Sequence, residues 1–268
     1  MLSSRSPVSV VALCLLVWAG CGGPGRTGRG LAPRVLSAEP VQGVSVEERA
    51  IACRVYGSGP ETVLIVGAIH GNEPASGTLA WQLWSHLEGR PSALDGTRCI
   101  VVPVANPDGL ARNTRTNARG VDLNRNFATP NWRRGRAHGP KPLSEPESRY
   151  LADVIRRYTP DRIVQIHQPL NCVDWDGPAR ALAEAMARAA RLPVRKLGAQ
   201  AGSLGSFAGV ERGIPTITLE LPRSASRLSP STLWQRYGEA LLVAVRSQQH
   251  AKPFKVGGSL ELRAVHTR

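Results

Sequence analysis

The sequence predicts an α/β fold with a mixed, mostly parallel twisted sheet and helices on both faces. Three observations lead to this prediction. Short runs rich in β-branched residues alternate with helical patterns along the chain. Two of these runs, residues 62–69 and 98–105, are almost continuously apolar, as expected for strands that are buried on both faces. The chain has 268 residues, which is enough for one sizeable α/β domain.

The first predicted elements are a short strand over residues 50–56 and the buried strand over residues 62–69. The sequence His70-Gly71-Asn72-Glu73-Pro74 follows the buried strand. A helix comes next, with one apolar face formed by Ala75, Leu79, Leu83 and Leu87. The second buried strand, over residues 98–105, ends at Asn106-Pro107-Asp108-Gly109, which is a strong turn signal.

The second half of the chain continues the alternation. Ser144 and Glu147 predict a capping box for a helix, and its apolar face comprises Leu151, Val154, Ile155 and Tyr158. Strands are predicted over residues 161–166, ending at His167, and over residues 215–219, ending at Glu220. An alanine-rich helix over residues 178–191 lies between them. Ser229 and Pro230 start a last helix that runs to about Gln248.

The N-terminus resembles a bacterial export signal over residues 1–21. Arg5 precedes an apolar stretch, residues 8–18, that is too short to span a bilayer. Ala19-Gly20-Cys21 resembles a lipobox, although Trp18 stands where that pattern usually has Leu. The alternative is an ordinary cleaved signal with a chance cysteine. We therefore expect an exported, periplasmic or membrane-anchored lipoprotein of a bacterium, whose only membrane contact is a lipid on Cys21.

Three further segments follow the signal. Residues 22–43, rich in Gly, Pro and Arg, predict a flexible linker. Residues 44–248 form the predicted catalytic domain, and residues 249–268 a loose tail.

The formal net charge of +14 has two interpretations. It reflects either a genome that favours Arg codons or attraction to an acidic partner such as cell-wall peptide, anionic lipid or nucleic acid. The charges are scattered along the chain, which favours the first interpretation, and no nucleic-acid partner is expected.

Cysteine usage excludes a disulfide framework. Outside the signal, Cys53, Cys99 and Cys172 allow at most one disulfide, and a Cys53–Cys99 pair stays open. A cysteine-ligated metal site is not expected, because no C-x-x-C pair occurs.

Metal-capable side chains follow three of the predicted strands: His70 with Glu73, then His167, then Glu220. Sites in open α/β sheets form at the carboxyl ends of strands. A catalytic zinc takes three N or O ligands and keeps one open position. By itself, His-x-x-Glu is weak evidence for zinc, since such a pair is more often a plain helix end. The remaining histidines fall on a helix surface, in loops or in the tail: His86, His138, His250 and His266.

Residues 106–127, NPDGLARNTRTNARGVDLNRNF, make the metal interpretation much stronger. This segment closely resembles the zinc metallocarboxypeptidase family, and within it the murein peptide amidase branch. Three more blocks match in the family's order: GAIHGNEPAS, QIHQPLNCVDWDGPA and GSFAGVERGIPTITLELP. The likeness runs from about Thr62 to Arg223 and implies a zinc carboxypeptidase-like fold.

The resemblance also implies a metal centre with one Zn²⁺ per chain. His70, Glu73 and His167 match the zinc ligands, and Glu220 matches the base that activates the attacking water. Asp122 matches a carboxylate that lies behind a zinc-binding histidine, where it fixes the tautomer of the ring.

Three further residues match substrate-binding positions. Arg115 corresponds to the arginine that polarises the scissile carbonyl. Asn124 and Arg125 correspond to the pair that clamps the terminal carboxylate of the substrate, for which a planar guanidinium is well suited.

The implied function is hydrolysis of a peptide bond next to a free C-terminal carboxylate, in particular the γ-D-glutamyl–diaminopimelate bond of murein peptides, by a monomer. Asp174 and Asp176 are candidates to hold the ammonium group of diaminopimelate; the alternative is a solvated loop. The mobile Tyr of digestive carboxypeptidases has no counterpart between Arg180 and Leu219. That departure argues against a general trimmer of protein chains.

Two alternatives stay open. One is an N-acyl amino acid deacylase of the aspartoacylase or desuccinylase type, which shares H-G-N-E. The other is an inactive peptidoglycan-binding lipoprotein, which would be expected to lack a ligand or the base.

Overall fold

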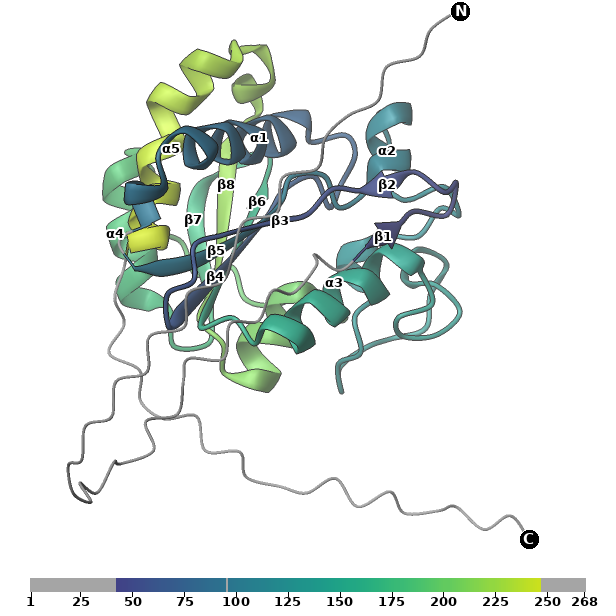
Figure 1. The fold of residues 1–268 in the computed structure, drawn as a ribbon. Coiled ribbons are helices and arrows are strands. Elements are labelled where there is room, and N and C mark those ends of the chain that lie inside the picture. The colour runs from purple at the N-terminus through teal and green to yellow at the C-terminus, as the bar shows by residue number, and fades with distance from the viewer. Residues whose placement is uncertain (1–41, 95, 247–268) are drawn as a thin grey trace, which may run out of the picture. The chain divides into compact units, whose positions relative to one another are not determined.

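A mixed six-stranded sheet organises the computed structural model, which describes residues 42–94 and 96–246 (Figure 1). The strand order is β3-β5-β4-β6-β8-β7. The four inner strands run parallel, and the edge strands β3 and β7 are antiparallel to their neighbours. The predicted mixed, mostly parallel sheet is confirmed. The strands are β3 (Arg54–Tyr56), β4 (Glu61–Val66), β5 (Thr97–Val102), β6 (Arg162–His167), β7 (Leu170–Asp176) and β8 (Thr216–Pro222).

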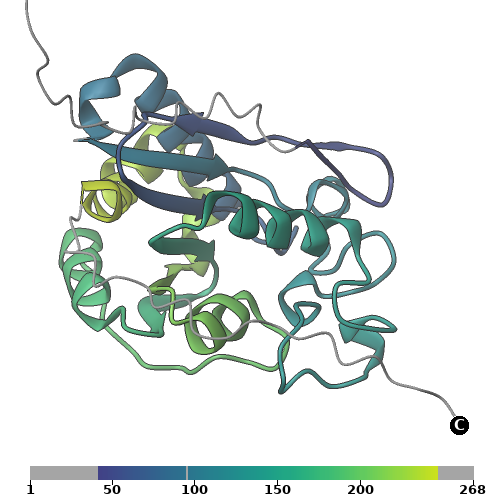
Figure 2. The ribbon, with the colours of Figure 1, turned by 60° about the horizontal axis from the view of Figure 1, so that its bottom comes forward.

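Helices cover both faces of this sheet (Figures 1 and 2). One face packs against α1 (Pro74–Gly89), α4 (Arg180–Ala190) and α5 (Pro230–Arg246). The other face packs against α3 (Pro146–Tyr158) and the π-helical segment η4 (Gly205–Val210). The expected signal (1–21), almost all of the expected linker (22–43) and the tail (249–268) lie outside the described residues.

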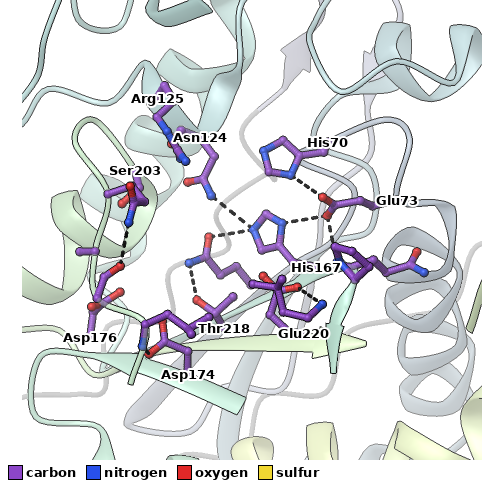
Figure 3. A pocket seen from close by; sticks show the side chains of 18 of the residues that line it. His70, Glu73, Asn124, Arg125, His167, Asp174, Asp176, Ser203, Thr218 and Glu220 are labelled. Atoms are coloured by element: carbon purple, nitrogen blue, oxygen red, sulfur yellow. Dashed lines mark hydrogen bonds and ion pairs between the residues drawn. The ribbon is translucent and has the colours of Figure 1, made fainter. Parts of the chain in front are cut away.

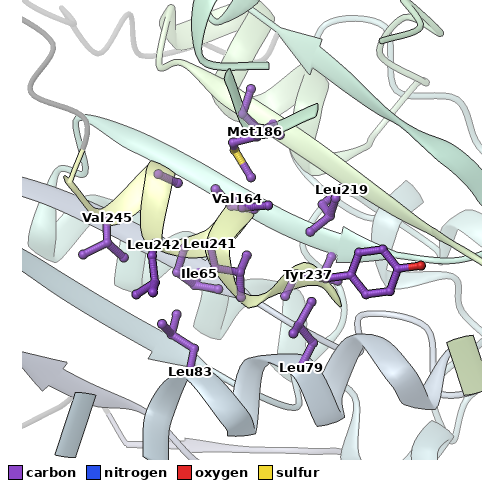
Figure 4. Close-up of a cluster of buried hydrophobic side chains, with 14 of the residues drawn as sticks. Ile65, Leu79, Leu83, Val164, Met186, Leu219, Tyr237, Leu241, Leu242 and Val245 are labelled. Carbon is purple, nitrogen blue, oxygen red and sulfur yellow. The ribbon is translucent and has the colours of Figure 1, made fainter. Parts of the chain in front are cut away.

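Strand β4 shows how the pattern of residues builds two cores. Its side chains alternate between the faces, as the pleat requires. Val63 and Ile65 pack under the helices of the first face, where Ile65 lies close to Leu83 of α1 (Figure 4). Leu64 and Val66 pack on the other face, under α3. Fully burying a side chain such as Leu83 stabilises the fold by roughly 1.5–3 kcal/mol.

The path of the chain through the sheet places the ends of β4, β6 and β8 together. The chain moves from β4 outward to β5 on one side, and from β6 outward to β8 on the other. The strand order therefore reverses between β4 and β6, which is where open α/β sheets form their sites. Residues His167 of β6 and Glu220 of β8 are direct partners in the parallel register.

The segment Asn106-Pro107-Asp108-Gly109 starts a helix, so the prediction of a simple turn was wrong. Helix α2 spans Pro107–Arg112. The side-chain oxygen of Asn106 accepts a hydrogen bond from the backbone N–H of Gly109 at 2.8 Å, which caps the helix. Pro107 occupies the first helical turn, where its missing N–H costs nothing. The same residue types serve turns and helix starts, which explains the error.

The predicted capping box at Ser144 and Glu147 is also wrong. Helix α3 begins at Pro146, and Glu145 is its cap residue. Glu147 instead accepts hydrogen bonds from the backbone N–H of Val46 (3.1 Å) and from Asn117 (3.1 Å), so it ties the N-terminal segment to α3. The predicted apolar face of this helix is confirmed, because all four of its residues are buried.

Several strands differ from the prediction. The run 50–56 divides into β2 (Ala50–Ile51) and β3, and β2 pairs with an unpredicted strand, β1 (Gly43–Val44). Strand β7 was missed altogether. The predicted start of the last helix is confirmed, since the Ser229 hydroxyl accepts from the backbone N–H of Thr232 at 3.2 Å.

Cys53, Cys99 and Cys172 are free thiols, so the Cys53–Cys99 pair is not formed. Within residues 42–94 and 96–246, no helix has the length and apolar character needed to cross a bilayer.

Candidate active site

A hollow of about 330 Å³ lies at the carboxyl ends of β4, β6 and β8 (Figure 3). It is lined by seven of the eight residues that match positions of the metal centre or the substrate-binding set of the family, and the eighth, Asp122, lies directly behind one of them. The seven are His70, Glu73, Arg115, Asn124, Arg125, His167 and Glu220. Four stretches of sequence that are far apart in the chain thus meet at one site.

Two histidines and one carboxylate form a compact, buried donor set. The ligand atoms of His70, Glu73 and His167 all lie within 4.8 Å of one another. Nδ1 of His70 lies 2.8 Å from one Glu73 oxygen, and Nδ1 of His167 lies 2.9 Å from the other. Both imidazoles therefore direct the same ring nitrogen toward the same point (Figure 3).

Glu73 occupies the cap position of α1, but its side chain makes no capping hydrogen bond. Its carboxylate turns to the histidines and accepts from the backbone N–H of Gln168 at 3.1 Å. Gln168 in turn accepts from the backbone N–H of Ala75 at 3.1 Å and so caps the helix in place of Glu73. Burial alone would raise the pKa of Glu73, but His167 and His70 lower that pKa to about 2.

The outer nitrogens of the two histidines also have acceptors. Nε2 of His70 lies 3.0 Å from Oδ1 of Asp122, and Nε2 of His167 lies 3.2 Å from Oε1 of Gln165. Although burial lowers it, the pKa of His70 is raised overall by Asp122 and Glu73.

This arrangement fits a divalent cation. Without one, Nδ1 of each ring must carry a proton that points at the shared Glu73 carboxylate. A cation held by the two Nδ1 atoms and Glu73 leaves each ring neutral, with an Nε2–H that donates outward. Imidazole and carboxylate are the ligands that catalytic zinc prefers.

Glu220 lies beside this donor set on β8 and is only 8% exposed, so a position facing bulk water is excluded. One of its oxygens accepts from the backbone N–H of Leu170 at 3.2 Å. Burial raises the pKa of Glu220, and the nearby His167 only partly offsets that effect.

Arg115 also lines the pocket. Its Nε donates to Oδ2 of Asp122 at 2.9 Å, and its Nη1 lies 3.5 Å from Glu73. The side chain is 45% exposed, which leaves donors free toward the hollow.

Asn124 and Arg125 lie in a short 3-10 helix, η2 (Leu123–Arg125). Oδ1 of Asn124 accepts from the backbone N–H of Leu204 at 2.8 Å, and Arg125 donates to the carbonyl of Asn124 at 2.7 Å. Burial lowers the pKa of Arg125. Both side chains project into the hollow (Figure 3).

Asp174 and Asp176 lie on β7, so the alternative of a solvated loop was wrong. They line the same hollow and are 5% and 3% exposed. Asp174 accepts from the backbone N–H of Leu197 at 2.9 Å, and Asp176 pairs with Lys196 at 2.9 Å.

Sequence reasoning missed several residues of the pocket. Gln165 and Thr218 each precede a predicted site residue by two positions on its strand, and Gln165 donates to Thr218 at 2.8 Å. The two-residue period of strands, applied to His167 and Glu220, was a signal that could have found them. The wall formed by residues 197–200 and Ser203 has no regular pattern and gave no signal.

Comparisons with known proteins agree with this geometry. Residues 32–171 match the sequence model of zinc carboxypeptidases. The chain is 36% identical to murein peptide amidase A of Escherichia coli K12 over 185 residues, which cover 62% of this chain and 73% of that protein. The protein of the same name from Vibrio campbellii is 33% identical over 190 residues, covering 62% and 71%.

Solved structures show the same fold. Murein-tripeptide amidase from Escherichia coli O157 superposes with a TM-score of 0.62 at 28% identity, covering 78% of this chain and 92% of that one. Bovine thrombin-activatable fibrinolysis inhibitor, in complex with tick carboxypeptidase inhibitor, gives a TM-score of 0.63 at 19% identity, with 76% and 86% covered. At that identity the second likeness concerns the fold alone.

Proposed function

Because the chain belongs to the zinc carboxypeptidase family, we propose that it is a zinc-dependent amidase that cuts the γ-D-glutamyl–diaminopimelate bond of murein peptides. The observation that carries this proposal is the single hollow in which a metal-binding triad, a buried carboxylate and a carboxylate-binding arginine meet. The names of the relatives support the choice of substrate.

His70, Glu73 and His167 would hold one zinc ion through two Nδ1 atoms and a carboxylate. When bound, zinc supplies a Lewis acid that lowers the pKa of water to about 7 and polarises a carbonyl. Asp122 and Gln165 keep the two rings oriented by accepting their Nε2–H groups.

Glu220 is the proposed general base, with its carboxylate taking the proton of the attacking water. Its raised pKa suits this role, because a general base works best when its pKa approaches the working pH. The hydrogen bond from Leu170 holds one oxygen and leaves the other for the proton.

Arg115 and the Asn124–Arg125 pair divide the binding of the substrate. The exposed face of Arg115 would stabilise negative charge on the scissile carbonyl oxygen. Asn124 and Arg125 would bind the free carboxylate one residue beyond the scissile bond, which restricts cleavage to the end of a peptide.

Asp174 and Asp176 are proposed to receive the ammonium group at the far end of diaminopimelate. Lys196 supplies one positive charge beside the two carboxylates, so this wall of the hollow keeps a net negative charge. A substrate that lacks the ammonium would forgo this charge-assisted contact, and polar contacts of this kind discriminate between substrates.

We also propose that the protein is exported and attached to a membrane by a lipid on Cys21, and that it acts as a monomer. The support for export and for the lipid is the sequence of residues 1–21, which lies outside the described part of the chain. Incorporation of labelled fatty acid by the wild type, and its loss in Cys21→Ser, is the direct test.

The decisive experiment is mass spectrometry of L-Ala-γ-D-Glu-diaminopimelate after incubation with the zinc-loaded protein. We expect L-Ala-γ-D-Glu and free diaminopimelate, and no products from the Glu220→Gln variant. An α-linked peptide of the same composition is the matched control for the γ linkage.

Two outcomes would contradict the proposal. Equal or faster cleavage of the α-linked peptide would remove the murein assignment but keep the zinc chemistry. Deacylation of N-acyl amino acids without cleavage of the tripeptide would identify a deacylase instead.

A further inference from the structure

A second hollow, of about 400 Å³, opens directly beside the catalytic pocket. The two hollows share Arg125, Ala199 and Gln200 as lining residues. On its other side the second hollow is bounded by the loop that follows η2, through Asn131, Arg133 and His138. It is therefore an extension of the pocket on the side of the proposed carboxylate clamp.

This second hollow is positively charged. Among the described residues that line it, Arg125 and Arg133 are cationic, and none is acidic. No described residue accepts a hydrogen bond from the guanidinium of Arg133, which is exposed. Arg125 donates from Nη1 to the carbonyl of Asn124. The hollow therefore holds at least one guanidinium, that of Arg133, with no anionic partner among the described residues.

The backbone that carries Arg133 is held in place. Nδ1 of His138 donates to the carbonyl of Arg133 at 2.6 Å, and the backbone N–H of Trp132 donates to Thr129 at 3.0 Å. Oδ1 of Asn131 accepts from the hydroxyls of Thr129 (2.6 Å) and Ser206 (3.2 Å). A cation on a fixed loop loses less entropy when it binds an anion than one on a mobile loop.

We propose that this hollow receives a second carboxylate of the substrate, located on the side chain of the residue that the enzyme releases. The inference rests on the proposed function, which places the first carboxylate of that residue on Asn124 and Arg125. A group that extends past Arg125 along the wall of Ala199 and Gln200 reaches Arg133 without leaving the two joined hollows.

The inference makes Arg133 a specificity-determining residue. Diaminopimelate is lysine with an added carboxylate on its terminal carbon, so the two differ in the one group that Arg133 would bind. The ammonium group on that same carbon is common to both, so it does not distinguish them. Because Arg133 is exposed, we expect a preference of about five- to tenfold, as for a charge-assisted contact open to solvent.

The test measures kcat/KM for L-Ala-γ-D-Glu-X, with X either diaminopimelate or L-lysine, in three variants and the wild type. Arg133→Gln should lower the ratio of the two values by about five- to tenfold, and Arg133→Lys should restore part of it. Arg134→Gln is the matched control, because this neighbouring arginine lines a different hollow, with Arg119 and Lys141. It should leave the ratio unchanged.

Calorimetric binding of free meso-diaminopimelate and L-lysine to the same proteins separates this inference from the proposed function. Tighter binding of diaminopimelate by the wild type, lost in Arg133→Gln, supports the inference even if no tripeptide is cleaved. Cleavage of both tripeptides with a ratio that Arg133→Gln leaves unchanged overturns the inference and keeps the amidase. An equal change in Arg134→Gln also overturns it, since general surface charge would then be responsible.

Discussion

Asp122→Asn should weaken zinc binding although Asp122 does not face the proposed metal position. One carboxylate accepts three hydrogen bonds there. Oδ1 lies 3.0 Å from Nε2 of His70 and 2.9 Å from the backbone N–H of Asn124, and Oδ2 lies 2.9 Å from Nε of Arg115. His70, Arg115 and the start of η2 are therefore oriented by the same group.

The size of the effect follows from these contacts. The amide oxygen of an asparagine can still accept from His70, but without the negative charge. Its NH₂ group would face the N–H of Arg115, donor against donor. A hydrogen bond to a charged group contributes about 1.5–3 kcal/mol, and about 1.4 kcal/mol corresponds to tenfold. We therefore expect a zinc Kd that is about ten- to a hundredfold higher, in line with other carboxylates behind metal-bound histidines.

Competition with a chromophoric chelator measures the zinc Kd of the wild type and the variant. Asp108→Asn is the control, because Asp108 is also a buried carboxylate but bonds to Ser45 at 2.7 Å and to the backbone N–H of Glu47 at 3.0 Å. Its zinc Kd should stay within about twofold of the wild type. If the zinc Kd of Asp122→Asn also stays within about twofold of the wild type, the role given to Asp122 is refuted.

Four further predictions concern catalysis and stability. Glu220→Gln should lower kcat by roughly two to four decades, with the zinc content by metal analysis unchanged, because it removes only the proton acceptor. Arg162→Leu should lower the free energy of unfolding in urea by about 3–5 kcal/mol, since the buried guanidinium bonds to Glu61 at 2.6 Å and to two carbonyls at the end of α5. Burial alone would raise the pKa of Asp108, but its hydrogen bonds to Ser45 and Arg49 lower it overall. Its stabilising contribution is thus present above about pH 4 and lost as the pH falls further. The free energy of unfolding, measured in urea, should therefore fall less between pH 7 and pH 3 in Asp108→Asn than in the wild type. Removal of zinc by a chelator should abolish activity and lower Tm, since a ligand at a thousand times its Kd stabilises by about 4 kcal/mol; an unchanged Tm would argue against tight binding.

Much of the fold and of the site could be predicted because both depend on strongly patterned segments. A strand that is buried on both faces needs a mostly apolar run, and β4 and β5 contain one. Polar residues at the ends of such runs are brought together by the parallel sheet itself. His70, His167 and Glu220 could therefore be placed near one another before any contact was known.

The remainder depends on contacts that no local pattern specifies. Strand β7 was missed because acidic and apolar residues alternate in it, and Asp174 and Asp176 suggest a loop when burial is unknown. Their polar partners are Lys196 and the backbone of Leu197, which lie 20 and 23 residues further along the chain. The capping box failed for a similar reason, since Glu147 serves a distant partner, Val46.

The catalytic residues lie on paired strands of the sheet, whereas the residues proposed to select the substrate lie on loops. His167 and Glu220 are opposite each other in a ladder of backbone hydrogen bonds, so their spacing does not depend on neighbouring side chains. The walls that would select the substrate, around Arg133 and Gln200, belong to irregular loops that tolerate insertion and exchange. Changes in those loops would therefore alter the peptide specificity of related enzymes, while the catalytic residues on the strands keep their positions.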